Sequence, residues 1–247
     1  TWHLPATIIV LLCANAFSII DAASARFGFT RTANLLGSCN LVSANSFRRF
    51  SVYIRFLKEK PVNKWGRKRK IMRRYDLTAH MYDLRYAEEQ EAKFKVALEN
   101  LFVIRNSIVL DVGCGTGLLF SHVAAEAETV VGLDVSRKLL LQARERAKNF
   151  RNVHLVQADA DNLPFKNDYF AVVFAFTLLQ NMPKPAETLN EIKRTAKHDA
   201  FIVVTGLKKT FSLEAFEELL QKAGLRVVSL KDDEVVKCYV AVSLRSS

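Results

Sequence analysis

A run of acid and glycines at residues 111–117, Asp-Val-Gly-Cys-Gly-Thr-Gly, is the part of this chain best suited to bind a ligand. The apolar, strand-like residues 107–110 precede it, and a helix-like segment follows. A chain that leaves a strand, turns on glycines and enters a helix presents unpaired backbone N–H groups above the turn. Gly113, Gly115 and Gly117 leave room there and permit backbone angles that other residues avoid. The run predicts a site for a polar or anionic ligand.

The spacing of these glycines separates two classes of ligand. A dinucleotide-binding turn reads G-x-G-x-x-G, and in register with Gly113 and Gly115 its third glycine would replace Leu118. The spacing here is G-x-G-x-G, with Asp111 two residues before the first glycine. This pattern resembles motif I of the class I S-adenosylmethionine (SAM) methyltransferases. The resemblance implies that Asp111 and the glycines bind the methionine part of SAM; a purely structural glycine turn is the alternative.

Two further acids end the next two strand-like runs. Asp134 follows the apolar residues 129–133, and an acid there can accept two hydrogen bonds from a ribose diol. Val135 is then placed to cover one face of an adenine ring. In the family that the glycine run resembles, an acid at the third strand tip accepts a hydrogen bond from the adenine amino group. Asp159 matches that acid, and the N–H of Ala160 is predicted to reach a ring nitrogen.

Each acid taken singly is also typical of a solvated loop or a helix cap. Asp111, Asp134 and Asp159 nevertheless stand at three successive strand ends in the order of the family. We therefore predict one SAM site at these tips, completed by Phe176 at the end of the fourth strand-like run.

From Ser107 onward, apolar runs alternate with segments of helical period, which predicts an α/β fold. The resemblance, which covers about residues 75–244, implies a three-layer Rossmann-like sheet, mostly parallel, with one antiparallel strand near the C-terminus. Strands are expected at residues 107–110, 129–133, 153–157, 169–176, 201–205, 225–230 and 235–244, and helices at 118–126, 136–149, 185–197 and 212–223. A turn is expected at 197–200.

Residues 75–83, Tyr-Asp-Leu-Thr-Ala-His-Met-Tyr-Asp, resemble the Y-D-x-x-A-x-x-Y-D opening of small methyltransferases of the quinone-biosynthesis and tRNA-wobble types. In those proteins the segment begins a helix that covers the SAM pocket, so residues 72–106 are predicted to form lid helices. Tyr82 is our candidate for contact with the carboxylate or sulfonium region of SAM. The alternative is that Tyr75 and Tyr82 simply stack on one helical face.

The acceptor side is expected at the tip of the fourth strand. Methyl transfer from SAM needs mainly alignment, and a base is required only for acceptors that must lose a proton. Relatives often carry a Leu-His-His-like stretch at this tip, whereas residues 179–181 read Leu-Gln-Asn. Gln180 can orient an acceptor but takes up no proton at neutral pH. The catalytic residue stays undefined, with Gln180, His80 and Tyr82 as acceptor-side candidates.

The five histidines and four cysteines lack the spacing of a metal or disulfide framework, so no metal is expected. A cysteine inside the glycine run, Cys114, is typical of a reducing compartment. This favours a cytoplasmic location.

Residues 1–71 differ in composition from the rest of the chain. They hold 12 of the 36 Lys and Arg but only two of the 25 acids, so they carry most of the net charge of +11. The apolar residues 6–20 are too few for a confident membrane span, and the acid-free residues 22–57 resemble an organellar transit peptide. We interpret 1–71 as a targeting segment, a disordered extension or a misassigned start, with the working enzyme beginning near Met72. The basic cluster 64–70 is interpreted as a solvated linker; contact with RNA or anionic lipid is the alternative.

Residues 107–247 are therefore predicted to form a SAM-dependent methyltransferase domain. A small-molecule or lipid-like acceptor is preferred to tRNA, because the nearly neutral domain lacks the basic surface that RNA binding normally uses. An activating protein subunit is a further expected partner that would supply such a surface. Stable membrane insertion is not expected, and an organellar location follows only if the extension is a transit peptide. A non-catalytic SAM-binding or assembly protein is the alternative function.

Overall fold

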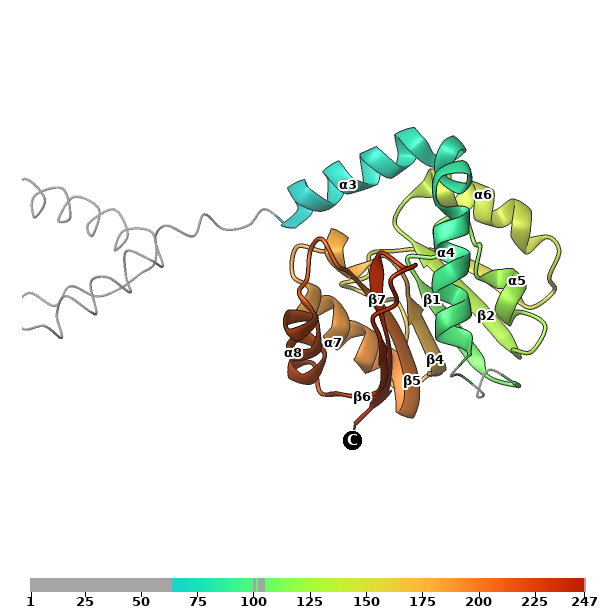
Figure 1. Ribbon diagram of the computed structural model, residues 1–247. Helices are drawn as coiled ribbons and strands as arrows, with labels where there is room; N and C mark the ends of the chain where they lie inside the picture. The colour runs from blue at the N-terminus through green and yellow to red at the C-terminus, as the bar shows by residue number, and fades with distance from the viewer. Residues whose placement is uncertain (1–63, 100, 102–104, 247) are drawn as a thin grey trace, which may run out of the picture. The chain divides into compact units, whose positions relative to one another are not determined.

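The computed structural model describes residues 64–99, 101 and 105–246, all within the compact unit Val62–Ser247 (Figure 1). Most of the predicted extension, residues 1–63, lies outside the described residues. Residues 64–71, the last eight of the predicted extension, form the start of helix α3 (Lys64–Thr78). The boundary predicted at Met72 therefore falls inside a helix. Arg, Lys, Ile and Met around this point all favour helix, and no proline interrupts them.

In the described part of the chain, seven strands form one sheet in the order β3-β2-β1-β4-β5-β7-β6. Their bounds are β1 Ile108–Val112, β2 Thr129–Asp134, β3 Val153–Gln157, β4 Phe170–Ala175, β5 Ala196–Leu207, β6 Leu225–Lys231 and β7 Cys238–Arg245. Neighbouring strands from β3 to β5 are parallel, and β7 is antiparallel to both β5 and β6. The predicted, mostly parallel sheet with one antiparallel strand is confirmed.

Helices cover both faces of this sheet, which explains why its central strands are apolar on both sides. The helices after α3 are α4 (Tyr82–Leu98), α5 (Phe120–Val123), α6 (Arg137–Ala147), α7 (Pro185–Thr195) and α8 (Leu213–Lys222). Side chains of α4, α5 and α6 share one buried cluster with Val109 and Val172, whereas α7 and α8 pack with Leu110 and Val173 in the other. Neighbouring residues of one strand thus face opposite layers. The architecture has three layers, as predicted.

Capping residues mark where two helices begin and where one of them ends. Ser136 precedes α6, and its Oγ accepts a hydrogen bond from Leu139 N at 3.2 Å. Ser212 caps α8 in the same way through Ala215 N. Gly224 ends that helix in the left-handed region, with φ of 70°.

Two local predictions differ from the structure. The helix expected at 118–126 is shortened to α5, because residues up to Leu119 still belong to the turn that follows the glycines. The turn expected at 197–200 is a bulge within β5, where Asp199 has a φ of 58° and the pairing with β4 shifts register. A bulge keeps the chain in the sheet while inserting extra residues.

Candidate active site

The carboxyl ends of β1, β2 and β4 meet at one edge of the sheet, where open α/β sheets place their ligands. A cavity that opens to solvent lies at this edge and is called the strand-tip cleft below. Its lining comes from the strand tips and from helix α3 and the start of α4: Lys68, Ile71, Tyr75, Tyr82, Gly113, Gly115, Leu133, Asp134, Val135, Leu139, Ala158, Asp159, Ala160, Phe176, Thr177, Leu178, Asn181 and Met182. Segments far apart in sequence therefore build one site.

A smaller hollow adjoins the cleft and extends it towards β1. Both hollows are lined by Tyr82, Gly113 and Phe176, and the smaller one also reaches Asp111. Gly117, by contrast, lines neither hollow. All the other residues predicted to bind the cofactor are brought together around this elongated space.

The glycine turn has the backbone shape that its sequence predicts. Gly113, Gly115 and Gly117 have φ angles of 79°, 57° and 79°, a region that strongly favours glycine. A Cβ atom on Gly117 would lie 2.3 Å from the ring of Phe120, whereas one on Gly115 would lie 3.8 Å from the ring of Tyr82. Gly117 is thus required for packing, and Gly115 for the turn beside the cleft.

Asp134 is buried at the tip of β2 and is held by two backbone donors. Its Oδ2 accepts a hydrogen bond from Gly115 N at 3.0 Å and its Oδ1 from Ser136 N at 2.8 Å. Burial raises the pKa of Asp134 to about 6, although these hydrogen bonds oppose the shift. Each oxygen keeps a further lone pair for a ligand.

Asp111 is buried at the end of β1, within the smaller hollow. Burial raises its pKa to about 8, and the negative charge of Asp134 adds to the shift. At neutral pH this carboxyl group is therefore mostly protonated in the free protein. A ligand that brought a positive charge into the hollow would favour its ionisation.

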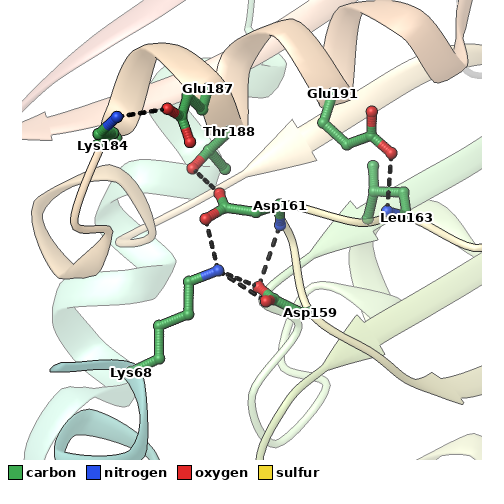
Figure 2. Close-up of polar contacts among 8 residues, drawn as sticks. All are labelled: Lys68, Asp159, Asp161, Leu163, Lys184, Glu187, Thr188 and Glu191. Atoms are coloured by element: carbon green, nitrogen blue, oxygen red, sulfur yellow. Dashed lines mark hydrogen bonds and ion pairs between the residues drawn. The ribbon is translucent and has the colours of Figure 1, made fainter. Parts of the chain in front are cut away.

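Asp159 forms an ion pair that the sequence did not predict. Lys68 Nζ on α3 lies 2.6 and 2.7 Å from the two oxygens of Asp159 and 2.5 Å from Oδ2 of Asp161 (Figure 2). The side chains of Lys68 and Asp159 are each only 11% exposed. The interpretation of residues 64–70 as a solvated linker is therefore wrong for Lys68, which packs inward when α3 folds over the cleft.

The two predicted lid tyrosines both line the cleft, with ring centroids 6.1 Å apart. The predicted ligand contact and the stacking alternative are thus compatible in this geometry. Burial raises the pKa of Tyr82 well above its usual value, with Tyr75 contributing. The hydroxyl of Tyr82 consequently stays protonated and serves as a hydrogen-bond donor, not as a base.

The aspartates that follow these tyrosines connect the lid to the strand tips. Asp76 accepts a hydrogen bond from Ser136 Oγ at 2.5 Å, next to Asp134. Asp83 accepts one from Thr116 Oγ1, inside the glycine turn, at 2.6 Å. Arg146 Nη2 lies 2.7 Å from the other oxygen of Asp83. The repeated Tyr-Asp pair was a signal for these contacts, since each pair places a ring in the cleft and a carboxylate against a residue that follows a strand tip.

A buried lysine supports the backbone at the tip of β4. Lys93 on α4 is fully buried, pairs with Glu89 at 2.9 Å and donates a hydrogen bond to Thr177 Oγ1 at 3.1 Å. Thr177 lines the cleft with a φ of 56°, and its N–H donates to Thr205 Oγ1. The sequence indicated only a packed helix here, because no local pattern marks a buried lysine.

Of the three acceptor-side candidates, the structure brings only Tyr82 into the cleft. His80 is exposed, and neither it nor Gln180 lines the cavity. Among the described residues, Gln180 Oε1 is buried without a hydrogen-bond partner. Asn181 lines the cleft instead, and its Nδ2 donates to the hydroxyl of Tyr75 at 3.1 Å. The predicted position was therefore one residue away from the amide that faces the site.

The part of the chain that the structure describes contains no group of three His, Cys, Asp or Glu residues arranged to hold a metal ion. Within the same residues, no helix is both long and apolar enough to cross a membrane.

Residues 110–204 match the family model described as a methyltransferase domain. This stretch contains the glycine turn, Asp134 and Asp159, which converge on one cleft. Residues 110–204 therefore belong to a methyltransferase domain of the class I SAM-dependent type. SAM is the cofactor of this family, and the strand order and single antiparallel strand fit its fold.

Curated relatives of this methyltransferase domain match it over part of their length. It is 29% identical over 144 residues to a malonyl-[acyl-carrier protein] O-methyltransferase of a Marinomonas species, covering 58% of this chain and 53% of that protein. It is 36% identical over 120 residues to a demethylmenaquinone methyltransferase of Staphylococcus haemolyticus, covering 47% of this chain and 50% of that protein. The chain thus spans about half the length of these relatives.

A solved structure shows the same fold as this methyltransferase domain. The SAM-dependent methyltransferase of Aquifex aeolicus superposes with a TM-score of 0.55 and is 19% identical, covering 62% of this chain and 89% of that one. At this identity the likeness concerns the fold alone.

Proposed function

We propose that this domain transfers a methyl group from SAM to a small-molecule or lipid-like acceptor. The observation that supports it most is the convergence of the glycine turn, the buried Asp134 and the partly buried Asp159 on one cavity. Concave sites with an apolar lining and a few fixed polar groups are typical of small-ligand sites. The activity rests on this site together with the family of the domain.

The residues present fit SAM along the whole length of the cavity. Asp134 would accept hydrogen bonds from the ribose hydroxyls with the lone pairs that Gly115 and Ser136 leave open. Asp159 and the N–H of Ala160 would bind the adenine edge, with Val135 against the ring. These three residues line the same end of the cleft.

The methionine part would occupy the smaller hollow. Asp111 and Gly113 line this hollow together with Phe176, so a positively charged α-amino group would meet a buried carboxyl there. A buried acid gains most from a charged partner, because water does not screen the pair. This assignment gives the raised pKa of Asp111 a role in binding.

When bound, SAM supplies a methyl group already activated on its sulfonium. The protein then has to align the acceptor and exclude water. The groups that line the cleft beyond the predicted cofactor residues include Ile71, Leu178 and Met182, with the amide of Asn181 and the hydroxyl of Tyr75. Such a lining fits an apolar acceptor that is oriented by one or two hydrogen bonds.

The names of the curated relatives support this acceptor class. One acts on a malonyl group carried by acyl-carrier protein and another on demethylmenaquinone. We propose an acceptor of similar kind, a small acyl or quinone-like compound, in preference to tRNA.

The test is incubation of the full chain with SAM labelled on its methyl group and a fractionated cell extract. We expect label in the organic-soluble or small-molecule fraction, and none with the Asp134→Ala variant. Label in RNA would contradict the proposed acceptor class.

A non-catalytic SAM-binding protein is the second candidate, favoured by one observation: among the described residues, neither Gln180 nor any histidine lines the cleft. SAM binding by the wild-type chain without label in any fraction would support this second function.

A further inference from the structure

Lys68 reaches the adenine end of the cleft from helix α3, outside the residues that match the family model. Its Nζ contacts both oxygens of Asp159 and one oxygen of Asp161 (Figure 2). All three side chains are at most 11% exposed. One ammonium group is therefore enclosed with two carboxylates, and this cluster keeps a net negative charge.

Each carboxylate also accepts a hydrogen bond from a group other than Lys68. Thr188 Oγ1, fully buried on α7, donates to Asp161 Oδ1 at 2.5 Å. The N–H of Asp161 donates to Asp159 Oδ1 at 3.1 Å. The lysine thus completes an arrangement whose acids are already positioned by the core.

The carboxylate of Asp159 has more acceptor positions than the surrounding donors occupy. A carboxylate accepts about four hydrogen bonds. Oδ1 accepts from Lys68 Nζ and from Asp161 N, whereas Oδ2 accepts from Lys68 Nζ alone among the residues that the structure describes. One acceptor position on Oδ2 therefore stays available to a donor in the cleft.

We propose that Lys68 is a positioning residue for recognition of the purine: it holds the Asp159 side chain oriented so that Oδ2 accepts a hydrogen bond from the exocyclic amino group of SAM. The inference rests on the proposed function, because it presumes that SAM occupies the cleft. It also connects recognition to the lid, since Ile71 and Tyr75 of the same helix line the cavity.

The competing arrangement is a latch, in which Lys68 occupies the place of the amino group and SAM has to displace it. The two arrangements predict opposite effects of removing the lysine. A latch that is removed gives tighter binding, whereas a lost positioning residue gives weaker binding with poorer discrimination between purines.

The experiment measures dissociation constants of the full chain by calorimetry for S-adenosylhomocysteine and S-inosylhomocysteine, in which an oxo group replaces the amino group. Wild type should prefer the adenosyl compound, because the oxo group meets a carboxylate. Lys68→Met should weaken adenosyl binding roughly tenfold or more, the usual effect of losing a charge-assisted contact, and should lower the preference. Lys68→Arg should restore most of the preference, since it keeps the charge.

Lys70→Met is the matched control, an exposed basic residue of the same helix that does not line the cleft, and it should behave as wild type. Lys68→Gln provides a second neutral variant if Lys68→Met folds poorly. Unchanged or tighter adenosyl binding by the neutral variants, or an equal loss for both ligands, would overturn the inference about Lys68 alone. Failure of wild type to bind either compound would overturn the proposed function and this inference with it.

Discussion

Binding of the cofactor product S-adenosylhomocysteine should release close to one proton at pH 7. Burial raises the pKa of Asp111 to about 8 and that of Asp134 to about 6 in the free protein. The proposed complex places the ligand's ammonium beside Asp111 and its ribose on Asp134, so both carboxyl groups ionise. The released protons therefore report directly on the two buried acids.

The expected number follows from these two values. At pH 7 a group of pKa 8 is about 90% protonated and a group of pKa 6 about 10%. The ligand's own α-amino group takes back about a tenth of a proton, so net release is about 0.9 per domain. At pH 6 the half-protonated Asp134 raises the release to about 1.5.

Calorimetric titrations in buffers of different ionisation enthalpy measure this quantity, because the slope of binding enthalpy against buffer enthalpy equals the number of protons exchanged. Asp111→Asn should reduce the slope at pH 7 to near zero while the protein still binds. A wild-type binding enthalpy that does not depend on the buffer would refute the reasoning about both acids.

The remaining predictions concern the stability of the free protein in urea. The pKa of Asp111 is higher in the folded than in the unfolded state, so the free energy of unfolding falls as pH rises towards 8. Asp111→Asn should remove this loss, which is on the order of 3 kcal/mol between pH 5 and 8. Equal pH profiles of unfolding for the wild type and the variant would contradict this. Gly117→Ala should destabilise by about 2–3 kcal/mol, since its Cβ would lie 2.3 Å from a ring, whereas Gly115→Ala should cost about 1 kcal/mol. Lys93→Met should cost about 1–3 kcal/mol, because it removes a charge-assisted hydrogen bond to Thr177 and an ion pair with the partly buried Glu89. The exposed Lys95→Met should cost little, and similar losses for the two would refute the role of Lys93.

Local patterns in the sequence were sufficient to predict most of the sheet and its strand-tip acids. Asp134 was predictable because it ends an apolar run, and parallel strands carry their tips to one edge. Asp159 was predictable because the family that the glycine run resembles carries an acid at the third strand tip. The cap at Ser136 was predictable for the same reason, since it depends only on its own helix.

Residues whose roles depend on packing between distant segments were not predictable. Lys68 looks like any solvated lysine until α3 folds against the loop that carries Asp159. The choice between Gln180 and Asn181 depends on the short 3₁₀ turn Leu179–Asn181, where neighbouring side chains point in different directions. A shift of one residue there decides which amide faces the cleft.

The most direct test of the account is a crystal structure of the protein with S-adenosylhomocysteine. We predict the ribose hydroxyls within hydrogen-bond distance of Asp134, the adenine amino group on Asp159, and the ligand's ammonium in the hollow beside Asp111. A ligand bound elsewhere, or a cleft in which Asp134 contacts no sugar at saturating ligand, would contradict the central claim.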